Sequence, residues 1–228
     1  MKKIAIVPAY NESENIVKTV NEIQERARGF DYIIINDCST DDTKHICEEN
    51  DFNIINLPIN LGIGGAVQTG YKYAQENGYD IAVQVDGDGQ HSPEYLEAML
   101  VDLITHDADM VIGSRYITFE GFQSTVMRRV GATYFTWLIK LLTGVTITDS
   151  TSGLRMVNGD AIALFSKYYP RDYPEPESIV SLLRQKKKVR EIPVMMNARE
   201  WGESSISISR SVYYMIKVSL AIIVERLR

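Results

Sequence analysis

Short apolar runs rich in β-branched residues alternate with amphipathic segments along the first half of this chain. The strand-like runs lie at residues 3–9, 32–37, 52–57, 81–85 and 108–115. Apolar residues recur at helical spacing between them, as Ile16, Val20 and Ile23 do,. Strands and helices in alternation predict right-handed crossovers. We therefore expect an α/β fold with a mostly parallel sheet flanked by helices.

Polar residues follow the ends of several predicted strands. They are Pro8 to Glu12, Asp37, Asp86 to Gln90, and Gly113 to Arg115. In open parallel sheets, ligands bind outside the carboxyl ends of the strands. These segments are therefore predicted to converge on one rim of the sheet and to form a binding site there.

The sequence DGDGQ places Asp86, Asp88 and Gln90 at alternate positions after a buried run. Two carboxylates so close raise each other's pKa unless a positive charge lies between them. Alternate side chains of an extended backbone share a face, and oxygen ligands suit Mg²⁺ or Mn²⁺. The glycines between them leave room for phosphate to approach the backbone. The alternative is a solvated acidic turn, since acids and glycines are common in turns.

Length and composition limit the remaining possibilities. The chain has 228 residues, which suits one large domain or one domain with a small appendage, and its net charge of −6 does not favour nucleic-acid binding,. The two cysteines are typical of free cytosolic thiols,. We find neither a signal peptide nor a run long enough to span a membrane, so the catalytic part is expected in the cytoplasm. The cluster Gly62, Gly64, Gly65 does not match a dinucleotide-binding fingerprint,.

Six motifs in order carry a resemblance to a known family. They are IVPAYNESENI, IIINDCSTDDT, NLGIGGAVQTGY, QVDGDGQHSPEYL, VIGSRY and DSTSGLR. Together they resemble the inverting family 2 glycosyltransferases of the GT-A fold, in particular the dolichol-phosphate mannose synthase type and bacterial polyprenyl-phosphate glycosyltransferases. The resemblance implies a Rossmann-like catalytic domain over residues 1–205. It also implies a nucleotide-sugar donor, a UDP-sugar by preference, a divalent metal and a lipid-phosphate acceptor.

The resemblance also assigns roles on the donor side. It implies that the nucleoside lies among Pro8, Ala9, Tyr10 and Glu12, with Asp37 against the base. Asp88 and Gln90 become the direct metal ligands, and Asp86 contacts the nucleotide or the metal. Arg199, in the segment AREWGESSIS, is expected to face the pyrophosphate in a loop that closes over the donor,.

Arg115 is expected to meet the donor phosphates, because a guanidinium forks onto oxyanions,. On the acceptor side, Arg128 is the candidate to clamp the phosphate, and Asp149 to orient the sugar or the attacking phosphate. A phosphate acceptor is already an oxyanion near neutral pH and needs no general base. A sugar hydroxyl needs one, and Glu177 or Asp172 is the candidate for that role,. The segment RDYPEPESIV lacks the Glu-Asp pair usual in hydroxyl-glycosylating members, which favours the phosphate.

Three functions follow from these features. The first is transfer of a sugar, glucose or N-acetylglucosamine by resemblance, to a polyprenyl phosphate for the modification of cell-surface glycans. The second is extension of a surface polysaccharide at a sugar hydroxyl. The third is a non-catalytic subunit that binds nucleotide sugars, which the intact DGDGQ disfavours.

A lipid acceptor requires access to the membrane. Residues 206–228 are predicted to form an amphipathic helix with basic residues at its edges, and residues 134–142 carry aromatic side chains suited to an interface,. We expect attachment to the inner face of the cell membrane, with a small membrane protein and a homo-oligomer as candidate partners. The alternative for both segments is packing against the core or a partner subunit.

Overall fold

The computed structural model describes residues 1–118, 126–197 and 208–227. Seven strands of this part form one sheet in the order β3-β2-β1-β4-β6-β5-β7. The strands are β1 (Lys3–Ala9), β2 (Asp31–Asn36), β3 (Ile54–Asn56), β4 (Ile81–Gln84), β5 (Met110–Ser114), β6 (Arg155–Asn158) and β7 (Val189–Pro193). Every neighbouring pair is parallel except the two pairs that involve β6. The predicted α/β class and mostly parallel sheet are confirmed.

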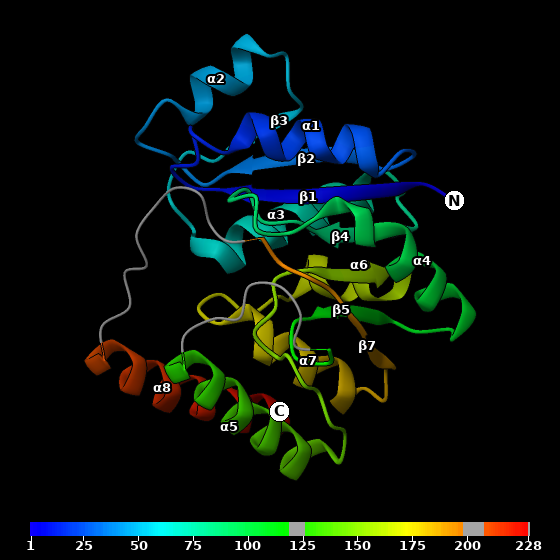
Figure 1. Ribbon diagram of the computed structural model, residues 1–228, viewed down its shortest axis with the longest axis vertical. Helices are drawn as coiled ribbons and strands as arrows, with labels where there is room; N and C mark the ends of the chain where they lie inside the picture. The colour runs from blue at the N-terminus through cyan, green and yellow to red at the C-terminus, as the bar shows by residue number, and fades with distance from the viewer. Residues whose placement is uncertain (119–125, 198–207, 228) are drawn as a thin grey trace.

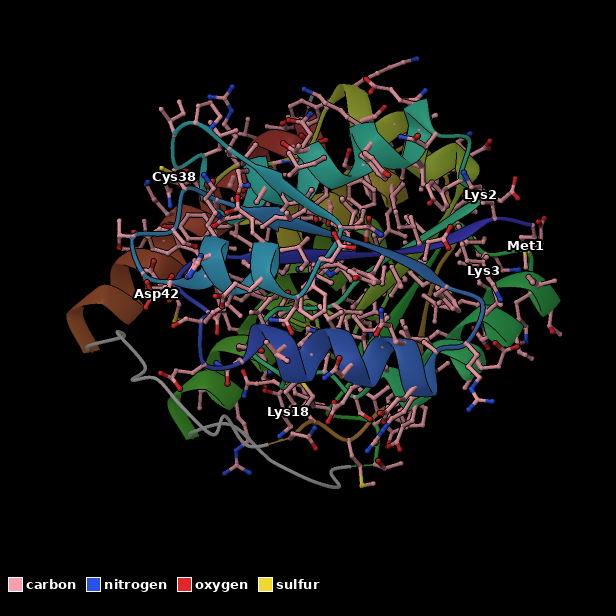
Figure 2. All side chains as sticks on the ribbon, turned by 90° about the horizontal axis from the view of Figure 1, so that it is seen from above. Met1, Lys2, Lys3, Lys18, Cys38 and Asp42 are labelled. Atoms are coloured by element: carbon pink, nitrogen blue, oxygen red, sulfur yellow. The ribbon has the colours of Figure 1, made fainter. Side chains whose placement is uncertain are left out.

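Helices cover both faces of the sheet. They are α1 (Ile16–Arg26), α2 (Thr43–Glu49), α3 (Gly62–Glu76), α4 (Leu96–Thr105), α5 (Val126–Thr143), α6 (Gly159–Lys167), α7 (Pro174–Arg184) and α8 (Ile208–Leu227), with a 3₁₀ turn, η1 (Pro93–Tyr95), before α4. One core layer joins the sheet to α1, α2 and α4, and the other joins it to α3 and α5 to α8. Figure 2 shows α1 in blue on one side of the sheet and α3 in teal on the other.

Alternation of side chains along β1 explains the two layers. Ile4 and Ile6 belong to the α3 layer, whereas Ala5 and Val7 belong to the α1 layer. Both faces of a parallel sheet are covered by crossover helices, so its strands are apolar on both sides. The continuous apolar runs of the sequence therefore reflect two-sided burial.

The carboxyl ends of β1, β2 and β4 meet on one rim of the molecule. Figure 2 shows Cys38 and Asp42, which follow β2, at the opposite end of the molecule from Met1, Lys2 and Lys3, which lead into β1. The parallel register of β1 with both neighbours brings Ala9 beside Asn36 and Ile6 beside Gln84. Residues that follow these strands therefore share the rim, as the sequence predicts.

The two longest helices lie side by side at one end of the molecule (Figure 1). The hydroxyls of Tyr134 on α5 and Ser219 on α8 are 3.0 Å apart, and Arg226 Nε donates to Leu142 O. Val218 and Ile222 of α8 are fully buried. Among the described residues, none of the helices combines the length and hydropathy needed to cross a membrane.

The loop between β1 and α1 is longer than its polar residues suggest. The first helix begins at Ile16 with Asn15 at the N-cap, so neither Asn11 nor Ser13 caps it. Asn11 adopts a left-handed conformation (φ 57°), and its side-chain oxygen accepts hydrogen bonds from Thr40. Residues 10–15 therefore form a structured loop on the rim instead of the first turn of the helix.

Candidate active site

A cleft of about 380 Å³ opens on the rim at the carboxyl ends of β1, β2 and β4. It is lined by Pro8, Ala9, Tyr10, Glu12, Asp37, Asn60, Gly62, Ile63, Ala66, Asp86, Gly87 and Asp88. Four segments distant in sequence contribute to it. The cleft brings together all five residues predicted to surround the nucleoside and both aspartates of DGDGQ.

On one side of the cleft, Asp37 connects β2 to α3. The side chain is buried, and its two carboxylate oxygens accept the backbone N–H groups of Leu61 at 2.7 Å and Gly62 at 2.9 Å. These amides lie at the start of α3, where backbone N–H groups have no partner within the helix and a carboxylate satisfies them well. Each carboxylate oxygen has a second lone pair, so Asp37 can still accept from a ligand.

Tyr10 and Glu12 lie on the loop between β1 and α1. Tyr10 is 49% exposed, so its ring is available for stacking on a planar base,. Glu12 accepts from the Asn15 amide at 2.8 Å, and its backbone N–H donates to Thr43 Oγ1. Glu12 is thus anchored at its backbone and held near the start of α1.

Asp86 follows β4 and is held in place from two sides. Its Oδ1 accepts from Gln84 Nε2 at 2.8 Å, and its backbone N–H donates to His91 Nδ1 at 3.0 Å. A Cβ atom at Gly153 would lie 2.6 Å from Asp86 Oδ2. The residue at 153 must therefore be glycine if the loop is to lie this close to the carboxylate.

Asp88 and Gln90 continue the acidic loop. Asp88 Oδ1 accepts the backbone N–H of Gln90 at 3.1 Å, which folds the loop back on itself,. Gly89 has φ +72°, a conformation that favours glycine,. The Gln90 amide nitrogen lies 3.5 Å from Asn197 O, which turns the amide oxygen of Gln90 away from that carbonyl.

Beside this loop, Arg115 and Asp149 form a two-bond ion pair. Arg115 Nε and Nη2 each donate to a different Asp149 oxygen at 2.7 Å, and Asp149 is fully buried. Hydrogen bonding and charge from Asp149 raise the pKa of Arg115 against its burial, and Asp86 contributes in the same direction. Arg115 therefore supplies positive charge near the acidic loop.

Comparison with known proteins decides the family. The model of the family described as Glycosyl transferase family 2 matches residues 4–165. The chain belongs to this glycosyltransferase family.

Two relatives of this glycosyltransferase match over most of both chains. An undecaprenyl-phosphate mannosyltransferase of Micrococcus luteus is 29% identical over 91% of this chain and 88% of its own. A UDP-N-acetylglucosamine–dolichyl-phosphate N-acetylglucosaminyltransferase of Methanococcus voltae is 31% identical over 92% and 93%. Both names state a lipid-phosphate acceptor for those proteins.

A solved structure supports the fold of this family 2 glycosyltransferase. Glucosyl-3-phosphoglycerate synthase of Mycobacterium tuberculosis, crystallised with Mn²⁺, UDP-glucose and phosphoglyceric acid, superposes with a TM-score of 0.75 at 14% identity. The match covers 99% of this chain and 79% of the other. The likeness establishes a GT-A glycosyltransferase fold.

Sequence reasoning assigned no role to Arg155, the last residue of DSTSGLR. Its side chain is fully buried, and its donors bond Ser152 O at 2.6 Å, Ser150 O at 2.9 Å, Ser178 Oγ at 2.8 Å and Glu175 O. All four acceptors are neutral. Arg155 thereby ties the loop that carries Gly153 to the start of α7. An arginine beginning a strand buried on both faces is the sequence signal for such a role.

Both acids at the start of α7, Glu175 and Glu177, have a raised pKa. Burial raises the pKa of Glu175, while the charge of Arg155 opposes this change. Burial also raises the pKa of Glu177 to about 7, and the nearby Glu225, Asp172 and Glu175 add to the effect. Glu177 lines a second cavity of about 490 Å³, together with residues of α3, α8 and the segment between α6 and α7. It is not among the residues that line the donor cleft.

Two predicted residues cannot be placed. The side chain of Arg128 and the whole of Arg199 lie outside the described part of the structure. Their assignment to phosphate stays a prediction.

The donor atoms on the acidic loop fit a hard divalent cation. Within residues 1–118, 126–197 and 208–227, no group of three or more His, Cys, Asp or Glu side chains is arranged to hold a metal ion. Mg²⁺ is usually held by one or two carboxylates together with substrate phosphates instead of an all-protein cage. Asp86 and Asp88, both lining the cleft, with the Gln90 amide oxygen nearby, are such a partial set.

Proposed function

We propose that this family 2 glycosyltransferase transfers a sugar from a UDP-sugar, with inversion, to a polyprenyl phosphate. The observation that carries the proposal is one cleft lined by Tyr10, Asp37 and both aspartates of DGDGQ, Asp86 and Asp88. The lipid-phosphate acceptors named for the relatives in M. luteus and M. voltae support the choice of acceptor.

In this proposal the donor lies along the rim from Tyr10 to Asp88. Tyr10 stacks on the base, Asp37 accepts from the ring imide and Glu12 from ribose hydroxyls. Gly87 is buried below the cleft, where a Cβ would lie 3.1 Å from Pro8 O. Because Gly87 has no side chain, a pyrophosphate can come close to the backbone there.

Asp88 and Gln90, with Asp86 beside them, would hold the cation. When bound, Mg²⁺ or Mn²⁺ supplies positive charge that stabilises the departing nucleoside diphosphate. Asp86 is held by hydrogen bonds from Gln84 to its carboxylate and from its own backbone N–H to His91. Such preorganisation reduces the reorganisation needed during the reaction.

The acceptor phosphate attacks the anomeric carbon from the side opposite the leaving group. Its second pKa is about 6, so an oxyanion is present at neutral pH and no protein base is required. The protein has to position that anion and neutralise it. We assign that role to Arg128. Arg115, held by two hydrogen bonds to Asp149, and Arg199 are assigned to the donor phosphates.

The exposed side of α5 and α8 supports access to a lipid. We call this surface the two-helix face; its exposed apolar residues are Val130, Trp137 and Leu141 of α5 and Ile216, Leu220, Ile223, Val224 and Leu227 of α8. The two helices carry six basic residues, and their one acid, Glu225, is buried. Apolar helices with basic flanks suit an anionic bilayer surface. We therefore assign peripheral membrane attachment to the two-helix face.

A sugar hydroxyl is the second candidate acceptor, and the pKa of Glu177 favours it. A carboxyl with a pKa of about 7 has the basicity expected of a general base at neutral pH,. Its place in the cavity beside α8, outside the donor cleft, counts against this role.

An acceptor assay tests the proposal. Purified protein is incubated with Mn²⁺ or Mg²⁺, a panel of UDP- and GDP-sugars, and undecaprenyl phosphate alone or a lipid-linked glycan alone. We expect a lipid-linked monosaccharide from undecaprenyl phosphate, with the anomeric configuration inverted relative to the donor. Transfer only to the lipid-linked glycan would support the hydroxyl acceptor and reject the phosphate.

A further inference from the structure

His91 is buried directly behind the acidic loop. Its side chain is 4% exposed, and Nδ1 accepts the backbone N–H of Asp86 at 3.0 Å. On the other side of the ring, Nε2 lies 3.8 Å from Asp86 Oδ2. A single imidazole therefore contacts both the backbone and the carboxylate of the same aspartate.

The hydrogen bond to Asp86 sets the tautomer of the ring. Since Nδ1 accepts a hydrogen, the proton of the neutral imidazole must be on Nε2. That N–H then lies on the side of Asp86 Oδ2. At 3.8 Å from Oδ2 this N–H is near the carboxylate without bonding it, whereas the Gln84 amide bonds Oδ1 at 2.8 Å.

Two distant segments pack around His91. A Cβ on Gly153 would lie 3.1 Å from His91 Cε1, so the loop after Asp149 presses against the ring. His91 also pairs with Met196 in an isolated β-bridge, and the next residue, Asn197, donates its N–H to Gln90 O at 3.0 Å. Three parts of the chain therefore converge on His91 and, through it, on the acidic loop.

We propose that His91 is a positioning residue that holds the Asp86 carboxylate ready for the cation of the bound nucleotide. The inference rests on the proposed cation site at Asp86, Asp88 and Gln90. It identifies His91 Nδ1 as the atom that orients the acidic loop. Partners behind a metal ligand typically change metal affinity or activity by about 10- to 100-fold when removed.

Substitution by Asn or Gln can distinguish the roles of the two ring nitrogens of His91. The Asn side-chain oxygen can occupy the place of Nδ1, whereas the longer Gln side chain reaches the place of Nε2. We expect His91→Ala and His91→Gln to weaken Mn²⁺-dependent UDP binding about tenfold or more, measured by calorimetry. His91→Asn should restore most of the affinity. The matched control is His45→Asn on α2, whose side chain is 69% exposed and which should bind like the wild type.

Nitrogen NMR on the ligand-free protein provides a readout that does not depend on activity. The chain has three histidines, so the His91 signals can be assigned with the Ala variant. We expect an unprotonated Nδ1 and a protonated Nε2. A ring protonated on Nδ1 would overturn the proposal, even if a variant failed to fold.

The remaining outcomes separate this proposal from the function above. If Asp88→Ala abolishes Mn²⁺-dependent UDP binding while His91→Ala binds like the wild type, the role of His91 is rejected and the cation site stands. Equal weakening by Asn and Gln also rejects the role of Nδ1. If the wild type binds UDP without any dependence on the cation, both proposals fail.

Discussion

The rim cleft and the two-helix face differ in the kind of side chain they present at the surface. In the cleft, the charged side chains of Asp37, Asp86 and Asp88 each accept a hydrogen bond from a backbone or side-chain N–H group of the protein. On the two-helix face, apolar side chains such as Trp137 and Leu220, each 58% exposed, lie at the surface. The cleft is thus shaped for a small charged ligand before one binds, whereas the face is suited to a broad apolar surface. Under the proposed function, donor recognition and lipid access are therefore expected to be separable by mutation.

The largest expected effect comes from removing a carboxylate of the cleft. Asp88→Ala should lower turnover by at least about 10³-fold, because the charge of the departing diphosphate loses its stabilisation. Sugar transfer from the nucleotide sugar, followed by chromatography of the lipid product, measures it. Vesicle binding should not change.

Asp80→Asn is the matched control for that variant. Asp80 lies at the amino end of β4, with its side chain 59% exposed, and Asp86 lies beyond the carboxyl end. The control should retain wild-type turnover. Full activity of Asp88→Ala would refute the cation assignment. It would also remove the chemical difference proposed between the rim cleft and the two-helix face.

A smaller effect is expected from adding one methyl group at Gly153, beside the Asp86 carboxylate. Gly153→Ala places Cβ 2.6 Å from Asp86 Oδ2, so the carboxylate or the loop must move. We expect Mn²⁺-dependent UDP affinity to fall about tenfold or more, measured by calorimetry.

Gly131→Ala provides the contrasting glycine. Apart from its chain neighbours and its own helix backbone, no atom of the described residues lies within 4 Å of its Cβ position on α5. This variant should bind normally and gain about 0.5–1 kcal/mol in its free energy of unfolding. If both variants bind alike, the contact between Gly153 and Asp86 does not set the affinity.

An added negative charge on the two-helix face should weaken membrane binding without changing donor binding in the cleft. Leu220→Glu should weaken binding to vesicles of phosphatidylglycerol and phosphatidylcholine about tenfold, because burying a leucine contributes about 1.5–3 kcal/mol. Co-sedimentation measures the effect, and donor affinity should not change.

Val101→Glu on α4 is the control for this substitution. Val101 is 56% exposed, close to the 58% of Leu220, but lies on a helix of the other core layer. It should leave vesicle binding intact. Equal losses in both variants would mean that the two-helix face has no special affinity for lipid.

The smallest expected effect concerns pH and stability at α7. The pKa of Glu177 is about 7 in the folded protein, above its ordinary value, so the folded state holds a proton that the unfolded state releases,. This group therefore destabilises the fold increasingly as pH rises from about 4.5 to 7. Glu177→Gln should raise the free energy of unfolding by about 1 kcal/mol at pH 8, allowing for solvent screening, and by little at pH 4.5.

Urea unfolding at the two pH values checks this dependence. Glu25→Gln on α1, an exposed glutamate, should show no such change. A stabilisation of Glu177→Gln that is the same at both pH values would contradict the raised pKa.

The sequence by itself determined the order of strands and helices, because side-chain period and apolar runs are local properties of the chain. It also determined that Asp37, Asp86 and Asp88 follow strand ends, and therefore that they share a rim once the sheet is parallel. Only the tertiary structure decided that β6 runs against its neighbours, that Gly153 presses on Asp86 and that Arg155 ties its loop to α7. These features depend on close packing between segments that are far apart in the chain, and no local pattern encodes such distances. For the same reason, the sequence predicted an amphipathic C-terminal helix, while its docking against α5 and α7 decided which of its apolar residues stay exposed.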